Sequence, residues 1–320
     1  MENILQLALN SPNIMRSARL IARYVTTLPT DLFSFVQSFL TYPYPSDDVC
    51  MQLNLKHVFK SNTVIYINNV PFSSQLFIAP GSSQNHHLYP GGLLAHTALN
   101  LQALTAINRI NRRVLTATEQ QGLIAAHIVH DLFKACLLNW ELDGTPTQEE
   151  RFEGTGIHHI LALIETVKRD GPLFLTQLIA HIHSSDDSKA KEWLNKALQL
   201  AGKSEAAILL SGITSQSQVL GTFARLAEVL EWEAAIFCEA YVRQRLRELA
   251  EEAAIGRDWP RPNSLEERWV QNIILMTYGE FKLYEVSRDD TGQLISYCYH
   301  IKHKLQQLKF WPLAKLFNST

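Results

Sequence analysis

The sequence predicts a mainly α-helical bundle, and three observations support this prediction. Apolar residues recur at three- and four-residue steps through most of the region from Gly91 to about Leu249. Polar, Gly- or Pro-containing segments separate these stretches, as expected of connections between helices. The 320 residues are 46% apolar and 19% charged, which is the composition of an ordinary globular protein. A chain of this length buries about three-quarters of its unfolded surface and needs no disulfides for stability.

The first eighty residues predict a small N-terminal extension. Helices are expected over Ile14–Val25 and Asp31–Leu40, since Asp31 after Pro29 and Thr30 suits a helix start. Thr63–Ile67 is rich in β-branched and aromatic residues, so a short strand is expected there. The Asn68-Asn69 dipeptide then indicates a turn.

The middle of the chain predicts a series of helices. Leu93, Thr97, Leu101 and Leu104 mark one apolar face. Thr118 followed by Gln121 fits a capping box that opens a helix running through Leu138. Asn139 to Thr155 is polar and indicates a loop. Further helices are expected over His158–Lys168, Pro172–His183, Lys189–Ala201, Glu205–Ser211 and Ser215–Ala254.

A boundary is expected at Asp258–Ser264, because two prolines within three residues cannot continue a helix. Leu265–Phe281 then predicts a helix, and Lys282–Ser287 and Gln293–His300 predict two strands of a hairpin around a Gly-containing loop. The expected organisation is an N-terminal extension (residues 1–80), a helical domain (81–257) and a small α+β appendage of a helix and a hairpin (258–320).

The bulk properties indicate the environment. A net charge of −2 gives no overall attraction to nucleic acid or to anionic membranes. The four cysteines form no CxxC pair and are expected to be reduced thiols. The N-terminus has no secretory pattern, and no stretch approaches the ~18 apolar residues of a membrane span. We therefore expect a cytoplasmic protein with no membrane partner, whereas the oligomeric state is left open.

Histidine is concentrated in one region. Nine of the 12 histidines lie between His86 and His183. His96 stands alone, and His130 is followed directly by Asp131. A mixture of imidazole and carboxylate suits one or two divalent ions such as Mn²⁺, Fe²⁺, Zn²⁺, Mg²⁺ or Ni²⁺. Adjacent helical residues differ by ~100° in direction, so His130 and Asp131 can approach one ion, while His96 must come from another helix.

At these residues the chain resembles the HD-domain superfamily of metal-dependent phosphohydrolases. The resemblance lies in a His, then a His-Asp pair, then further histidines. The segment His86–Thr97, HHLYPGGLLAHT, is similar to the branch that includes bacterial HD-type exoribonucleases and the HD domains of one class of conjugative relaxases. The resemblance covers roughly Gly81 to Glu233, about half of the chain. It implies that residues 81–257 form an HD-domain helical bundle.

The resemblance also implies the metal ligands. His96, His130 and Asp131 would hold one ion, and Asp131 would bridge it to a second. Alignment of the segment Glu153–Ile160 selects His159 over His158 for the second ion. His181 and His183 lie two positions apart and point in nearly opposite directions on a regular helix, so one is expected to be a ligand. Both could reach the site if the helix ends at Ser184-Ser185.

The chain departs from the family at the distal Asp that closes the first metal site. The matching segment, Phe223–Glu233, contains no Asp. Glu228 is the expected replacement, with Glu231 behind it, because a glutamate also supplies oxygen to a divalent ion. Asp186 or Asp187 could serve instead. The remaining alternative is that this ligand is lost and metal binding is weakened.

Three other side chains are expected to act on the substrate. In the family a Lys at the position of Lys134 helps to bind the substrate phosphate, and Lys134 lies three residues after Asp131, on the same helical face. We expect Asp131 and Lys134 to be catalytic. The glycines Gly91 and Gly92 permit a tight loop that would present His87 or Tyr89 to the substrate.

The expected function is a metal-dependent phosphohydrolase or phosphodiesterase that acts on a nucleotide or nucleic-acid phosphoester. The partner would be a phosphorylated small molecule or a nucleic acid. Two alternatives remain open. One is a diiron oxygenase, because some HD-fold proteins use similar His/Asp sets. The other is a non-catalytic module that binds nucleic acid or another partner, as the relaxase-like resemblance and the missing Asp permit.

Overall fold

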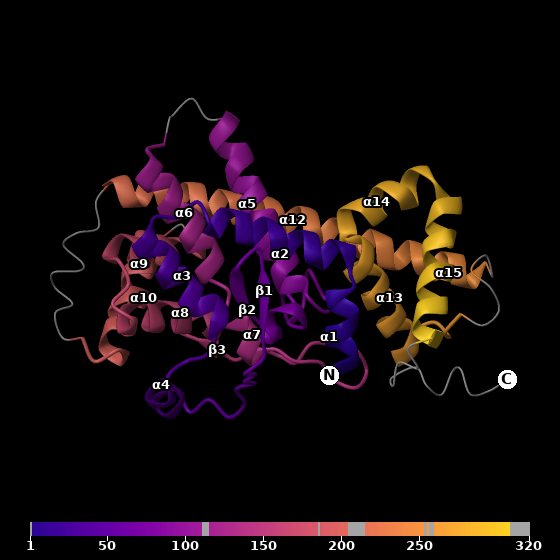
Figure 1. Ribbon diagram of the computed structural model, residues 1–320, viewed down its shortest axis with the longest axis horizontal. Helices are drawn as coiled ribbons and strands as arrows, with labels where there is room; N and C mark the ends of the chain where they lie inside the picture. The colour runs from indigo at the N-terminus through magenta and orange to yellow at the C-terminus, as the bar shows by residue number, and fades with distance from the viewer. Residues whose placement is uncertain are drawn as a thin grey trace.

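The computed structural model describes residues 2–110, 115–184, 186–203, 215–252, 255 and 259–307. The fold is mainly α-helical, as predicted, with two very short β-hairpins in the described part of the chain (Figure 1). The predicted helix over Glu205–Ser211 lies outside the described residues. Among the described residues, no helix combines the length and the apolar character that crossing a membrane requires.

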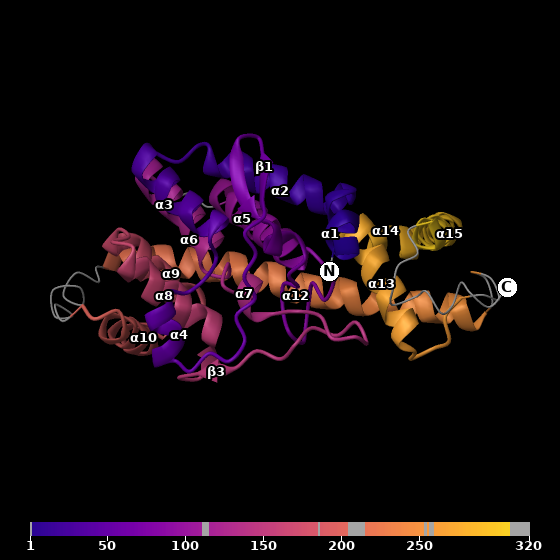
Figure 2. The same cartoon turned by 60° about the horizontal axis from the view of Figure 1, so that its bottom comes forward.

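One long helix, α12 (Ser215–Glu251), runs along most of the molecule (Figures 1 and 2). Its 37 residues span roughly 55 Å at about 1.5 Å per residue. It packs against α9 (Leu173–Ile182) near one end and against α14 (Glu280–Asp289) near the other. Between them it packs against α5 (Gly92–Ile110). Helix α12 therefore links the histidine-rich region to the C-terminal helices.

In the N-terminal region two helices, one strand and the turn after it form where the sequence predicts them, together with two helices and a second strand that it did not predict. The helices are α1 (Glu2–Leu9), α2 (Pro12–Val25), α3 (Thr30–Thr41) and α4 (Asp47–Gln52). Strands β1 (Val64–Ile67) and β2 (Val70–Ser73) pair antiparallel, and a short 3-10 helix, η1 (Ser74–Phe77), follows. Asn68 and Asn69 form the two-residue turn with φ of 50° and 65°, the left-handed conformation that such hairpins favour. Helix α2 packs on α5, so this region supports the histidine-bearing helix.

Of the helices around the histidines, the one before His130 is much shorter than predicted, and the others lie within two residues of the predicted bounds. Helix α6 (Ala117–Val129) opens with a capping box, but Thr116 and Glu119 form it, two residues before the predicted pair. The helix ends at Val129, not at Leu138, because the chain turns through residues 130–133 before the one-turn helix α7 (Lys134–Leu137). Beyond β3 (Arg151–Phe152) and β4 (Thr155–Gly156) come α8 (Ile157–Lys168), α9 and α10 (Asp187–Leu200).

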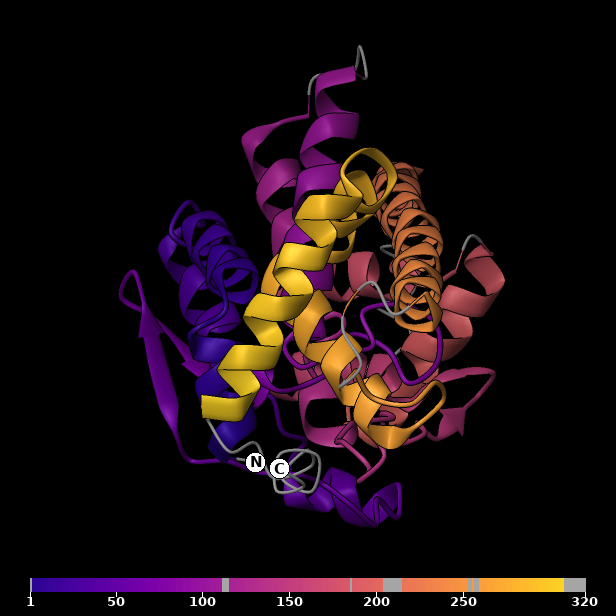
Figure 3. The ribbon, with the colours of Figure 1, turned by 90° about the vertical axis from the view of Figure 1, so that its right-hand side faces the viewer.

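The predicted C-terminal hairpin is wrong. Helix α13 (Leu265–Tyr278) is followed by α14 and α15 (Thr291–Gln307), which cover Lys282–Ser287 and Gln293–His300 (Figure 3). Tyr297, inside the second predicted strand, lies on α15 and stacks on Tyr278 of α13 with ring centroids 3.9 Å apart. The burial pattern decides for helix, since the buried residues recur at steps of four, three and four: Leu294, Cys298, Ile301 and Leu305.

One hydrophobic cluster extends from Ile4 to Leu305 and includes side chains from all three predicted segments. The division into residues 1–80, 81–257 and 258–320 stays a prediction. The helices of the histidine-rich region therefore pack in one core with N-terminal and C-terminal helices.

Candidate metal centre

The centre begins with His96 on α5 and with His130 and Asp131 in the turn after α6. All three side chains are fully buried. His130 Nδ1 lies 3.0 Å from the carbonyl oxygen of His127, to which it donates. This contact fixes the proton on Nδ1 and leaves the lone pair of Nε2 facing Asp131. Because α6 ends at Val129, His130 and Asp131 lie in the turn that follows it, and their side chains meet in the same buried centre.

The first ligand group consists of His96, His130, Asp131 and Glu228. His96 Nε2 lies 3.0 Å from Asp131 Oδ2 and 3.2 Å from Glu228 Oε1. His130 Nε2 lies 3.4 Å from Glu228 Oε2 and 3.6 Å from Asp131 Oδ2. Helix α12 thus brings Glu228 to the position at which the sequence lacks the expected Asp.

The second ligand group consists of Asp131, His158 and His183. Asp131 Oδ1 lies 2.9 Å from His158 Nε2 and 3.6 Å from His183 Nε2. Behind His158, Glu149 Oε1 accepts from its Nδ1 at 2.5 Å and from its backbone amide at 2.9 Å. Asp131 therefore offers one carboxylate oxygen to each group.

The electrostatics of the centre fit a cation. Burial by itself lowers the pKa of His158, but the neighbouring carboxylates of Glu149 and Asp131 together outweigh burial and raise the pKa to about 9. Burial also raises the pKa of Glu228, and the neighbouring His96 and His130 hold it well below its usual range. The carboxylates thus favour the charged form of His158, and the histidines favour the charged form of Glu228, whereas burial lowers the pKa of His183.

Several ligand atoms also make no hydrogen bond. Within the described part of the chain these are His130 Nε2, Asp131 Oδ1, His158 Nε2 and His183 Nε2, which meet one another or Glu228 only in the ion-pair contacts given above. Buried polar atoms without hydrogen bonds are costly and rare in proteins, and one or two divalent ions would satisfy all four. Imidazole nitrogens with carboxylate oxygens suit Mn²⁺, Fe²⁺, Zn²⁺ or Ni²⁺. The residues present therefore fit a metal centre.

Lys134 completes the charged cluster. Its Nζ lies 2.5 Å from Asp131 Oδ2, and its side chain is almost fully buried. An ammonium group at this position partly neutralises the carboxylates and lies beside both ligand groups.

Two of the predicted ligands lie outside these groups. His159 Nε2 donates to the carbonyl oxygen of Ile179 at 2.9 Å, so the structure brings His158 to Asp131 and not His159. His181 points to Asp187, 3.7 Å away. Helix α9 ends at Ile182, and this end lets His183 turn toward Asp131 while His181 remains on the helix. Asp186 caps α10 and does not contact the centre.

His87 and Tyr89, which were expected to face the substrate, are fully buried. His87 has φ of 52°, which lies in the left-handed region. Its nitrogens contact Glu231 and Glu280, and the Tyr89 hydroxyl donates to Glu280. A role in direct contact with substrate is therefore not supported for either residue.

Sequence reasoning missed Glu149, Glu280 and the participation of His158. Glu149 lies in the segment read as a plain loop, and Glu280 lies next to the wrongly predicted hairpin. Asn100, whose Nδ2 donates to Glu228 Oε2 at 2.5 Å, could have been found, because it follows His96 by one helical turn.

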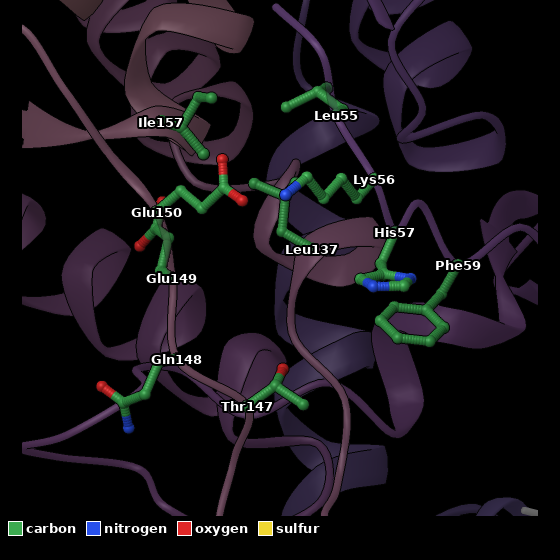
Figure 4. Close-up of a pocket in the computed structure, with 10 residues that line it drawn as sticks. All are labelled: Leu55, Lys56, His57, Phe59, Leu137, Thr147, Gln148, Glu149, Glu150 and Ile157. Atoms are coloured by element: carbon green, nitrogen blue, oxygen red, sulfur yellow. The ribbon is translucent and has the colours of Figure 1, made fainter.

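A cavity of about 120 Å³ adjoins the second ligand group. Figure 4 shows Leu55, Lys56, His57 and Phe59 on one side and Glu149 with Glu150 on the other. The same Glu149 holds His158, so the cavity wall is one side chain away from the ligand group.

The fold and the centre define a helical protein with a buried His/carboxylate site suited to divalent metal. No family model matches the chain, and no solved structure matches it. The chain is 30% identical over 106 residues to the dihydroneopterin 2′,3′-cyclic phosphate phosphodiesterase of Methanocaldococcus jannaschii. This match covers 33% of the chain and 42% of the relative, less than half of the relative's length.

Proposed function

We propose that this chain is a metal-dependent phosphodiesterase of the HD-domain type. The observation that carries the proposal is Asp131, whose two carboxylate oxygens face two different groups of histidines. A carboxylate placed in this way could contact two metal ions at once, one through each oxygen. The partial similarity to a phosphodiesterase supports the same reaction class.

In the proposed centre His96, His130, Asp131 and Glu228 would hold the first ion. Asp131, His158 and His183 would hold the second. This assignment replaces His159 and His181 with His158 and keeps His183 from the predicted pair. When bound, the ions lower the pKa of a water molecule and polarise the phosphoryl oxygens.

The surrounding side chains have separate tasks. Lys134 supplies an ammonium group that counters the charge developing on the phosphate. Glu149 keeps the proton of His158 on Nδ1, so that Nε2 remains free to bind metal. Asn100 holds Glu228 by donating to its Oε2. Each contact fixes a ligand before the substrate arrives.

The proposed substrate is a nucleotide or nucleic-acid phosphodiester. The cavity beside Glu149 combines the apolar side chains of Leu55, Phe59, Leu137 and Ile157 with Lys56 and with the carboxylates of Glu149 and Glu150. Its apolar part suits a flat, base-like ring, and its polar groups could fix the orientation of that ring. The relative is named for a cyclic phosphate of a pterin, which is also a flat heterocycle with a phosphodiester.

The test begins with elemental analysis of protein purified without chelators, followed by hydrolysis of bis(p-nitrophenyl) phosphate and of 2′,3′-cyclic nucleotides with Mn²⁺. We expect about two equivalents of metal per chain and turnover that Asp131→Asn abolishes. Asp48→Asn, at an exposed site away from the centre, is the matched control and should keep wild-type activity.

Other outcomes point to the alternatives. Bound iron with strong near-ultraviolet absorption and no hydrolysis would favour a diiron oxygenase. Failure to bind any divalent ion would overturn the proposal and leave the binding module as the better reading.

A further inference from the structure

A buried chain of side chains leads from the metal ligand His96 to the C-terminal helix α14. His96 Nδ1 lies 2.8 Å from Glu231 Oε2, and Glu231 Oε1 lies 2.5 Å from His87 Nε2. His87 Nδ1 lies 3.3 Å from Glu280 Oε1, and the Tyr89 hydroxyl donates to Glu280 Oε2 at 2.5 Å. These residues come from α5, α12, the loop before α5 and α14.

The carboxylates of Glu231 and Glu280 determine which nitrogens of His96 and His87 carry protons. Each oxygen of Glu231 accepts from one histidine, so His96 must carry its proton on Nδ1 and offer the lone pair of Nε2 to the metal. His87 lies between two carboxylates and therefore donates from both of its nitrogens. Glu280 is the acceptor at the far end, and Tyr89 holds its second oxygen.

Burial strengthens the contacts between these side chains. The side chains of His87 and His96 are fully buried, and those of Glu231 and Glu280 are 2% exposed. In such a setting hydrogen bonds between charged groups are strong, and an unpaired member is costly. None of these four lines a cavity described for this protein, so His87, Glu231 and Glu280 hold His96 in place without contacting the substrate.

We propose that Glu280 is a positioning residue for His96, acting through His87 and Glu231. The inference rests on the proposed metal centre, and it makes the C-terminal helices part of that centre. Tyr89 and Glu231 are the other positioning residues of the chain. Glu231, His87 and His96 also lie, with His86, close enough to hold an ion, but in this proposal Glu231 and His87 orient His96 instead.

The experiment is a titration of the metal-free full chain with Co²⁺, followed through its visible absorption bands. Glu280→Gln keeps the size of the side chain but removes the charge that faces His87. We expect Co²⁺ affinity at the first group to fall about ten- to a hundred-fold, with altered band positions, and affinity at the second group to stay the same. Tyr89→Phe, which removes only one hydroxyl, should change the first group in the same direction by a smaller factor.

Glu165→Gln is the matched control, because Glu165 is equally buried but pairs with Ser46 and Arg169 away from the centre. It should bind Co²⁺ as the wild type does. Circular dichroism establishes that each variant is folded, and Tyr89→Phe decides the question if Glu280→Gln is not.

The outcomes separate this inference from the proposed function. Wild-type Co²⁺ affinity in both folded variants overturns the positioning role and leaves the phosphodiesterase proposal standing. A wild-type chain that binds no Co²⁺ overturns both. Normal Co²⁺ binding with weakened first-group affinity in the variants, but no hydrolysis, supports the positioning role and contradicts the proposed reaction.

Discussion

At the scale of single residues, the candidate centre depends on how carboxylates orient histidines. Asp131 serves two ligand groups, while Glu149 and Glu231 each hold a histidine from behind through its Nδ1 atom. A histidine alone can present either nitrogen, and its carboxylate partner decides which one faces the metal. The residues behind the ligands are therefore as informative as the ligands.

Replacing Glu149 with glutamine should weaken the second group. Without the carboxylate, the proton of His158 is no longer held on Nδ1, so metal affinity at this group should fall about ten- to a hundred-fold. Calorimetric titration with Mn²⁺ measures the change. Glu150→Gln is the matched control, since Glu150 is exposed and borders the same cavity. Equal losses in both variants would contradict the role of Glu149.

The stability of the metal-free protein should depend on pH through His87. Burial by itself lowers the pKa of His87, but the carboxylates of Glu231 and Glu280 together outweigh burial and raise the pKa to about 10. The folded state therefore keeps a proton that the unfolded chain releases near its ordinary value of about 6.5. This contribution to stability is complete below about pH 6.5 and is lost as the pH rises toward about 10.

The measurement is the thermal midpoint from about pH 6 to about pH 10. It should fall more steeply in the wild type than in His87→Gln. The charged or titratable groups that face His87 are His86, Tyr89, His96, Glu231 and Glu280. The same pH slope in both proteins would show that His87 is not the group responsible.

The residues behind the ligands were the hardest to predict from the sequence. His96, His130, Asp131 and Glu228 lie together as the HD-like pattern suggests. Alignment chose His159 over His158, yet the choice depends on how the chain enters α8, because one step along a helix turns a side chain by ~100°. Glu280 lies 149 positions after Asp131, and no local pattern relates residues so far apart.

At the scale of elements, helix ends decide the site. The turn after α6 and the end of α9 present Asp131 and His183. The sequence predicted a continuous helix through the first of these places, whereas it predicted the end of α9 to within one residue. Capping patterns located the start of α6 to within two residues, since capping is local. The C-terminal hairpin failed because aromatic and β-branched residues favour strands on average, and tertiary burial overrode that preference.

The junction of the His87 loop with α5 should not tolerate a side chain at Gly92. A Cβ atom there would lie 2.1 Å from the carbonyl oxygen of His87. Gly92→Ala should cost about 1–3 kcal/mol of unfolding free energy. It should also lower Co²⁺ affinity, because it displaces the loop that holds Glu231.

Gly202→Ala is the control for this change. Gly202 has φ of 70° with open space around it, so alanine should cost only about 1 kcal/mol of backbone strain. Urea denaturation measures both values. The prediction fails if the two variants are equally stable and bind Co²⁺ equally.

At the scale of the whole molecule, one core joins the N-terminal helices, the histidine-rich helices and α13 to α15. We therefore expect the metal-free chain to unfold in one cooperative transition. Calorimetry tests this by comparing the calorimetric enthalpy with the van't Hoff enthalpy, which should agree. Two separate transitions would instead support an independent unit after residue 258.

Helix α12 carries Glu228, Glu231, Glu239 and Arg243, at steps of three, eight and four residues. Glu228 completes the first candidate metal group, and Glu231 accepts from His96. Glu239 accepts from the backbone N–H of Leu88, next to His87, and Arg243 donates to the carbonyl oxygen of Leu88. Inserting a single residue among them would rotate every later contact by ~100° and shift it by ~1.5 Å. Chains that share this centre should therefore differ in length at their loops, whereas the interval from Glu228 to Arg243 should not vary in length at all.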